Sequence, residues 1–296
     1  MKSLREIIKE AEKNQVAIGH FNVSDCVGLK AVFGAAKELN LPIIIGVSEG
    51  EREFIGVKRI ADAVKSIREE FNYPIFLNAD HTHSLGKIKE AVEAGFDAVM
   101  FDGSGLPLEE NIKKTKEAVG FVKDANPEIL IEAELGYIRG SSAILTDAAI
   151  QPEDLTKPEE AARFVKETEI DLLAPAVGNL HGIIARTNAD LTQTNAENPP
   201  LDIERIRKIK EACSIPLVLH GGSGIKDEDF KAAIKAGISV IHINTELRLA
   251  WRRGLEKSFA ASPQEIVPYK LLPGAVDEIR AVVAKKLKLF SGMSKV

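Results

Sequence analysis

The sequence predicts an α/β fold, a (β/α)8 TIM barrel in which eight parallel strands alternate with helices. Short apolar runs alternate with charged amphipathic segments of 3.6-residue spacing along the chain. Several runs, such as residues 42–47, are apolar throughout, as strands covered on both faces should be. The 296 residues suit one such barrel. We therefore expect a single domain over residues 1–296 with a C-terminal helical extension; an open doubly wound sheet, the alternative, would split this length into two domains.

Eight runs have the length and composition of strands. They are residues 15–23, 42–48, 74–80, 98–104, 128–136, 172–179, 216–222 and 239–246. Helix punctuation lies between them: Ser3 with Glu6, and Thr156 with Glu159, fit capping boxes, in which a hydroxyl and a carboxylate satisfy free backbone N–H groups. The least regular stretches, 138–157 and 183–200, follow the fifth and sixth runs, where a barrel carries catalytic-face loops and lids.

Charge and hydropathy exclude several classes of protein. With 39 Lys and Arg against 44 Asp and Glu, and no long basic block, the chain is not expected to bind nucleic acid or an acidic membrane surface. The apolar runs are far shorter than the roughly 20 residues that a membrane span needs. The first ten residues mix charges with Leu and Ile, unlike a signal peptide. We expect a soluble, cytoplasmic protein.

Histidines mark the strand ends. Each lies in, or within three residues of, the C-terminal part of a predicted strand, the barrel face on which active sites form. They are His20, His81, His83, His181, His220 and His242. A catalytic zinc keeps three protein ligands, most often imidazoles, and one open position, and His81, His181 and His220 come from three strands. The sequence therefore predicts a zinc site; the alternative is a metal-free cluster of hydrogen-bonded histidines.

A glycine-rich turn, His220-Gly-Gly-Ser-Gly224, leads into the helix expected near Lys226. Exposed N–H groups and a helix N-terminus favour an anion there. Barrel phosphate sites commonly use the loops after strands seven and eight, and the eighth run ends in His242-Ile-Asn244-Thr245. A phosphorylated substrate is predicted, although such a sequence can also be a simple turn.

Carboxylates share the same strand ends. Asp80 directly precedes a candidate ligand and is the best general acid and base. Asp102 and Glu134, with Glu132 nearby, are candidates to orient the histidines or to form an alternate metal position; for Asp102 the alternative is turn capping. No strand run contains a lysine, which disfavours Schiff-base chemistry and leaves a metal to polarise the carbonyl.

Seven motifs resemble, in order along nearly the whole chain, the class II zinc-dependent ketose-bisphosphate aldolases, the fructose- and tagatose-bisphosphate enzymes. They are Phe21-Asn22-Val23, Asn78-Ala-Asp80-His81, Val99-Met-Phe-Asp102, Glu132-Ala-Glu134-Leu-Gly136, Val177-Gly-Asn-Leu-His181-Gly182, Leu219-His220-Gly-Gly-Ser-Gly224 and Asn244-Thr245-Glu246-Leu247. The resemblance implies that His81, His181 and His220 hold Zn²⁺. It further implies that Asp102 and Glu134 form a second divalent position.

The resemblance also implies roles in catalysis and substrate binding. Asp80 would protonate the aldehyde oxygen in condensation and deprotonate the hydroxyl in cleavage. Ser48, at the end of the second run, would contact the other phosphate of the substrate, and the family implies a homodimer or homotetramer. The residues expected to bind the dihydroxyacetone phosphate part, with a monovalent cation such as Na⁺ or K⁺ beside them, and to complete the substrate site are Gly182, Gly221, Gly222, Ser223, His242, Asn244 and Thr245.

Two departures from the family pattern bear on the substrate. Serines, Ser141 and Ser142, stand where the family carries a loop Glu that moves the ketol proton, and Asp147 and His83 are candidates to replace it. His242 stands where a substrate-binding Asn is usual. The leading hypothesis is cleavage of a ketose 1,6-bisphosphate, fructose 1,6-bisphosphate first, to dihydroxyacetone phosphate and glyceraldehyde 3-phosphate. The alternatives are a metal-dependent lyase or isomerase of another sugar phosphate, and a non-catalytic sugar-phosphate-binding barrel.

Overall fold

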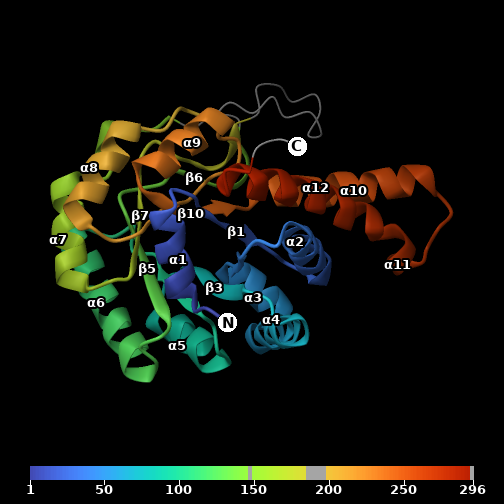
Figure 1. The fold of residues 1–296 in the computed structure, drawn as a ribbon, viewed down its shortest axis with the longest axis horizontal. Coiled ribbons are helices and arrows are strands. Elements are labelled where there is room, and N and C mark those ends of the chain that lie inside the picture. Colours follow the sequence, from blue (N-terminus) through green and yellow to red (C-terminus); the bar gives the residue numbers. More distant parts are fainter. Residues whose placement is uncertain (146–148, 185–197, 294–296) are drawn as a thin grey trace.

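The computed structural model describes residues 1–145, 149–184 and 198–293, and its main sheet is a closed barrel of eight parallel strands (Figure 1). The order of the strands around the barrel is β1-β10-β9-β7-β5-β4-β3-β2, which confirms the predicted (β/α)8 fold. Their bounds are β1 (Ile18–Asn22), β2 (Ile43–Val47), β3 (Ile75–Thr82), β4 (Ala98–Phe101), β5 (Leu130–Leu135), β7 (Leu172–Pro175), β9 (Leu217–Leu219) and β10 (Ile238–Ile243).

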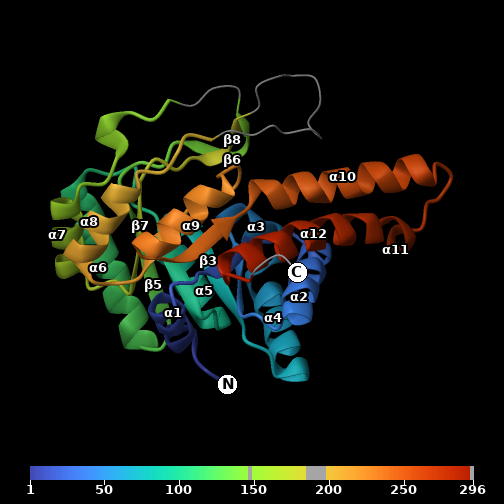
Figure 2. The ribbon, with the colours of Figure 1, turned by 45° about the horizontal axis from the view of Figure 1, so that its top comes forward.

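Helices connect and cover the strands. Around the barrel they are α2 (Cys26–Leu39), α3 (Glu49–Ile55), α4 (Val57–Phe71), α5 (Leu85–Ala94), α6 (Leu108–Ala125), α7 (Pro158–Thr168), α8 (Ile203–Cys213) and α9 (Asp227–Ala236). The chain ends in α10 (Thr245–Ala261), α11 (Pro268–Leu271) and α12 (Pro273–Phe290). In both ribbon views α10 and α12 lie side by side and project beyond the barrel, as the expected C-terminal extension (Figures 1 and 2). Among the described residues no helix is long and apolar enough to cross a membrane.

One end of the barrel is closed by apolar packing. The inward-facing layer contains Ile44, Phe76 and Val218, all buried, and α1 (Leu4–Lys13) packs its buried Leu4 and Ile8 against the same cluster. The outward-facing strand residues pack against the surrounding helices in a second cluster. Because α1 fills the end where the strands begin, an active site has room only where they finish.

The helix signals are partly confirmed. Ser3 and Glu6 form the predicted capping box of α1. The prediction for Thr156 is wrong, because α7 begins at Pro158 with Lys157 as its N-cap. The Thr156 hydroxyl instead donates to the Leu135 carbonyl and accepts from the Ala176 N–H at 2.8 Å. Two buried backbone groups beside strands β5 and β7 compete successfully for that hydroxyl, which the sequence spacing does not reveal.

A second, two-stranded sheet was not predicted. Strands β6 (Gly140–Leu145) and β8 (His181–Ile184) pair in parallel, with Gly140 opposite His181. Both had been assigned wholly or partly to irregular loops. Figure 2 shows this small sheet above one end of the barrel, where it carries His181 and Ser142 toward the strand ends. Residues 146–148 and 185–197 of the same two stretches, Asp147 among them, lie outside the described residues.

Candidate active site

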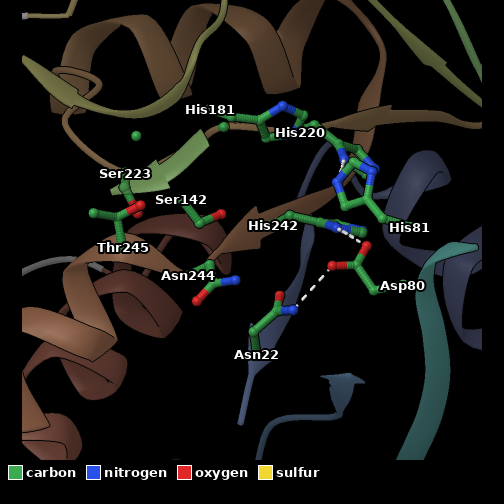
Figure 3. Close-up of a pocket in the computed structure, with 12 residues that line it drawn as sticks. Asn22, Asp80, His81, Ser142, His181, His220, Ser223, His242, Asn244 and Thr245 are labelled. Atoms are coloured by element: carbon green, nitrogen blue, oxygen red, sulfur yellow. Dashed lines mark hydrogen bonds and ion pairs between the residues drawn. The ribbon is translucent and has the colours of Figure 1, made fainter. Parts of the chain in front are cut away.

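A pocket at the C-terminal ends of the barrel strands collects most of the residues singled out from the sequence (Figure 3). In the view of Figure 3, Ser223 and Thr245 lie on one side of it and His81 and Asp80 on the other. Its lining comprises Asn22, Asp80, His81, Ser142, His181, Gly182, His220, Gly221, Ser223, His242, Asn244 and Thr245. Asp102 and Glu134 lie next to it, in an adjoining cavity that shares His81, Ser142 and His181.

Two histidines are oriented by carboxylates. His81 Nδ1 lies 2.8 Å from Asp102 Oδ2, and the buried His220 Nε2 lies 2.7 Å from Glu132 Oε1. The remaining nitrogens, His81 Nε2 and His220 Nδ1, face each other at 3.2 Å. A carboxylate on one imidazole nitrogen fixes the ring and leaves the other nitrogen as the ligand atom, which is how metal-binding histidines are usually held.

The third histidine completes the arrangement. His181 Nδ1 lies 3.3 Å from the Ile138 carbonyl, and its buried Nε2 has no hydrogen-bond partner among the described residues. Burial lowers the pKa of His181 to about 3, so the ring is neutral and can offer a lone pair. Glu134 Oε2 is likewise a buried atom without a hydrogen-bond partner among those residues, and burial raises the pKa of its carboxyl to about 7.

These groups fit a zinc ion. Ligand atoms of His81, Glu134, His181 and His220 all lie within 4.8 Å of one another. Imidazoles with a carboxylate are a donor set that zinc prefers. His81 also has a φ of +38°, a left-handed conformation that a non-glycine residue adopts only where its surroundings enforce it. The backbone and the carboxylates therefore hold these side chains with His81 Nε2 and His220 Nδ1 turned toward the same point, 3.2 Å apart.

Asp80 is held beside this cluster by two other strands. Asn22 Nδ2 donates to Asp80 Oδ2 at 2.9 Å, and His242 Nδ1 lies 3.3 Å from Asp80 Oδ1 (Figure 3). Burial alone would raise the pKa of Asp80, but the neighbouring His81 and His242 imidazoles outweigh it and hold the pKa well below its usual range. The carboxyl is ionised and ready to accept a proton.

The remaining histidines differ in exposure. His20 is fully buried beneath His242, with the two rings stacked at 3.4 Å, and its Nε2 contacts the Asn78 amide at 3.1 Å. His83, by contrast, has a side chain that is 60% exposed, and its Nδ1 lies 3.3 Å from the carbonyl oxygen of Asp102 and 4.0 Å from its carboxylate. Five of the six histidines thus gather at or beneath the pocket, and His83 lies at its rim.

Glycines form the opposite wall of the pocket. A Cβ on Gly182 would lie 2.4 Å from the Ser141 carbonyl oxygen, and one on Gly221 would lie 2.0 Å from that of Leu180. Their φ values are +108° and +61°. Only glycine lets these backbones approach so closely. Helix α10 begins beside them at Thr245, and its N-terminus adds the positive potential that favours an anion.

Two predicted substrate residues do not line the pocket. Ser48 is the N-cap of α3, and its N–H donates to Glu51 Oε2 at 2.8 Å. The Gly222 N–H donates to the His242 carbonyl at 3.0 Å.

Asp102 both orients a histidine and caps a turn, the two alternatives considered for it. Besides its contact with His81, its Oδ1 accepts from the N–H and hydroxyl of Ser104 in a local turn. Sequence reasoning did not single out Asn78, which only the barrel brings under the site.

Comparison with known proteins places the chain in a class. It matches the family described as Fructose-bisphosphate aldolase class-II over residues 2–295. It is 34% identical to a fructose-bisphosphate aldolase of Geobacillus stearothermophilus, covering 99% of this chain and 98% of that protein. It is also 33% identical to a 6-phospho-5-dehydro-2-deoxy-D-gluconate aldolase of Shouchella clausii (strain KSM-K16), covering 98% and 94% respectively.

Solved structures agree with these relatives. The crystal structure of the YdjI aldolase from Escherichia coli K12 superposes with a TM-score of 0.79 at 30% identity, covering 99% of each chain. A fructose-bisphosphate aldolase from Campylobacter jejuni, 22% identical with a TM-score of 0.80, shares the fold and covers 97% of this chain and 93% of its own. The fold and its relatives define a lyase on a (β/α)8 barrel. The chain belongs to the class II fructose-bisphosphate aldolase family, whose members depend on a metal ion.

Proposed function

We propose that this chain is a zinc-dependent aldolase that reversibly cleaves a phosphorylated ketose to dihydroxyacetone phosphate and an aldehyde. The observation that carries the proposal is the set of three imidazoles, each oriented by a bond to its other nitrogen, beside the ionised Asp80. Fructose 1,6-bisphosphate, which would give glyceraldehyde 3-phosphate as the aldehyde, is the first substrate to test. The sequence resemblance and the name of the Geobacillus relative both favour it.

The metal would be held by His81 Nε2, His181 Nε2 and His220 Nδ1, with Asp102 and Glu134 as a second divalent position. Zinc bound there would supply a Lewis acid, whose positive charge would offset the negative charge that develops on the substrate. Glu134 supports the second position because its buried Oε2 lacks a partner among the described residues.

Asp80 moves the proton of the reacting hydroxyl. In cleavage its carboxylate accepts the hydroxyl proton, and in condensation it returns that proton to the aldehyde oxygen. Asn22 and His242, on opposite oxygens of the carboxylate, keep it aimed at the pocket. Ser142 lines the pocket where the family carries its loop Glu. A serine hydroxyl stays protonated at neutral pH, so Ser142 cannot accept the ketol proton as a carboxylate would.

The phosphate of the dihydroxyacetone part would bind to the backbone of Gly182 and Gly221 and to Ser223 and Thr245. Support comes from their shared lining of the pocket and from the N-terminus of α10. A monovalent cation, Na⁺ or K⁺, would balance charge beside them. Asn244, between the metal side and α10, would contact the ketose hydroxyls.

A second candidate function is the aldol reaction of another sugar phosphate. It is favoured by Glu51, whose carboxylate takes up the Ser48 N–H that a second phosphate would otherwise use. The third candidate, a barrel that binds sugar phosphates without turnover, rests on Ser142 in place of the loop Glu and predicts binding at every metal loading with no product.

We further propose a cytoplasmic homodimer or homotetramer built as one domain. The projecting extension exposes Phe259 of α10, Tyr269 of α11 and Ile266 in the loop between them, which are 52%, 76% and 87% accessible. Apolar side chains gathered at the tip of such an extension are typical of a contact between subunits. Sedimentation of the wild type and of a triple Ser variant at these positions measures it, and an unchanged oligomer would contradict this surface as the contact.

The function is tested by a coupled assay for dihydroxyacetone phosphate released from fructose 1,6-bisphosphate and from tagatose 1,6-bisphosphate. Activity should disappear with a chelator and return with zinc. An H181A variant, which loses one imidazole, should bind less zinc and remain inactive after zinc is restored. Turnover that persists in the chelated protein would contradict the proposal, and absence of turnover of both bisphosphates by the zinc-loaded protein would favour the second candidate or the third.

A further inference from the structure

We infer that the aldehyde half of the substrate ends in uncharged hydroxyl groups rather than in a second phosphate, and that buried Glu51 makes this selection. This inference rests on the proposed aldolase function and specifies its substrate class. It would make the natural substrate a ketose carrying its phosphate only on the dihydroxyacetone side.

The aldehyde half has a defined place to go. A second cavity adjoins the active-site pocket and shares Asn22 and Asn244 with it. Asn22 donates directly to Asp80. The second cavity therefore begins next to the carboxylate that accepts the hydroxyl proton in cleavage. In Figure 3 Ser223 and Thr245, on the dihydroxyacetone phosphate side, lie at the left, Asn22 lies at the bottom, and Asn244 lies between them. A substrate that spans the pocket therefore extends its aldehyde end into the second cavity.

Glu51 takes up hydrogen bonds from two residues that line that cavity, Asn22 and Arg248, and from the Ser48 N–H beside them. Its Oε2 accepts from Asn22 Nδ2 at 2.9 Å and from the Ser48 N–H at 2.8 Å, and its Oε1 accepts from Arg248 Nη2 at 2.8 Å. Glu51 is 5% exposed, so its bonds to Asn22 and Ser48 are made largely out of water, whereas the Arg248 side chain is 47% exposed. A phosphate would have to displace a buried carboxylate from three donors, which costs more than an exposed ion pair would.

The net charge around the cavity opposes a dianion. Asp25 and Glu51 line it, and Asp80 lies just beyond Asn22. Among the described residues of its lining, Arg248 is the one basic side chain, and it is already paired with Glu51. Buried Arg52 adds a positive charge nearby, but its donors go to backbone carbonyls and to a threonine hydroxyl away from the cavity.

The same carboxylate suits a hydroxylated aldehyde. Each carboxylate oxygen has lone pairs beyond those used by Asn22, Ser48 and Arg248, and a hydroxyl group can donate to them. The dihydroxyacetone phosphate side offers the opposite chemistry, since glycine backbone and hydroxyls line it and Asp80 is the one acid in the described lining of that pocket. The two ends of the site are thus matched to one charged and one neutral end of a ketose.

The test compares aldehydes that differ only by a phosphate. The condensation of dihydroxyacetone phosphate is measured with D- and L-glyceraldehyde and with their 3-phosphates, in the zinc-loaded full chain. For the preferred stereoisomer we expect the kcat/KM of the wild type to be about tenfold or more higher for the unphosphorylated aldehyde than for its 3-phosphate. A wild type that prefers the phosphorylated partner would overturn the inference.

Charge variants identify the responsible residue. E51Q keeps the shape of the side chain and should shift the kcat/KM ratio about tenfold toward the 3-phosphate, mainly through its KM. R248L, which removes the cation, should shift the ratio the other way and keeps the idea testable if E51Q does not fold. E53Q, on the exposed face of the same helix, is the matched control and should leave the ratio unchanged. A ratio unmoved in folded E51Q would exclude Glu51 as the determinant.

Failure of the aldolase function is recognisable separately. Exchange of the α-proton of dihydroxyacetone phosphate with deuterated solvent needs no aldehyde. If zinc-loaded protein shows neither this exchange nor condensation with any of the four aldehydes, the proposed function fails. If exchange or condensation occurs and the phosphorylated aldehyde is preferred, only the inference about Glu51 fails.

Discussion

At the scale of single residues, the site depends on which nitrogen of each imidazole is already engaged. Glu132 takes His220 Nε2 and Asp102 takes His81 Nδ1, so the free nitrogens turn toward the same point. The carboxylates thereby select the tautomer that can bind a metal. The chemistry of the cluster follows from these partners as much as from the histidines themselves.

Glu132 therefore provides a direct test. E132Q should weaken zinc affinity about 10- to 100-fold, because the amide no longer holds His220 Nε2–H as a carboxylate does. Competition with a chelator of known affinity measures the change. E128Q removes an exposed carboxylate two positions before β5 and should bind zinc like the wild type. Equal affinities for E132Q and E128Q would refute the role assigned to Glu132.

Asp80 should separate catalysis from metal binding. D80N removes the proton acceptor while Asn22 and His242 remain in place, so kcat for cleavage should fall about 10²- to 10⁴-fold. Zinc content, measured by atomic emission, should stay at the wild-type level because Asp80 is not needed to hold the metal. A D80N enzyme with nearly full activity would assign the proton transfer to another group.

At the scale of elements, the small β6–β8 sheet places one ligand and one pocket wall on the same support. Its pairing requires Gly182, where a Cβ would press on the Ser141 and Ala143 carbonyl oxygens at 2.4 and 2.6 Å. G182A should push β8 away from β6 and raise the KM for the ketose phosphate by tenfold or more, an order-of-magnitude expectation for a lost anchoring contact. The matched control is G120A on the exposed face of α6, where a Cβ meets open space. An unchanged KM in G182A would remove this wall from the phosphate site.

The last helix is equally specific in its packing. Phe290 of α12 is 1% exposed, packs on Phe230 of α9 with ring centroids 5.2 Å apart, and accepts the Ala17 N–H through its carbonyl. F290A should lower the free energy of unfolding by about 3–5 kcal/mol, as deletion of a buried aromatic ring does. Denaturant unfolding measures it against F54A, whose ring is 79% exposed and whose loss should cost under about 0.5 kcal/mol. Similar losses for the two variants would mean that α12 contributes little to the fold.

At the scale of the whole molecule, the metal joins segments far apart in sequence. His81 lies in β3, His181 follows β7 at the start of β8, and His220 follows β9, so a bound zinc would cross-link these segments and favour the folded state. Zinc held at about 100 times its dissociation constant should add about 2.7 kcal/mol to the unfolding free energy, seen as a rise in Tm by several degrees. A calorimetric scan of chelated and zinc-restored protein checks this, and magnesium at the same concentration is the control. Identical Tm values would indicate that zinc does not bind the native site.

Much of this architecture follows from the sequence alone. Strand-length apolar runs in alternation with amphipathic segments indicate a parallel sheet covered on both faces, and the length of 296 residues favours one barrel over an open doubly wound sheet. The barrel in turn dictates that the residues after each strand share one mouth. Asp80, His81, His181 and His220 could therefore be brought together in advance, although they are separated by up to 140 positions.

The tertiary structure decided what depends on competition between distant groups. The Thr156 hydroxyl was lost to backbone groups of β5 and β7, and residues 140–145 became a strand because β8 offered them a partner. Glu51 likewise reaches Asn22 across 29 positions and changes the character of the aldehyde side. Local patterns determine the periodicity of each element and the order of the elements along the chain. A hydroxyl or carboxylate, by contrast, has several possible partners. Its partner is decided only when the packed chain brings the groups within hydrogen-bond distance.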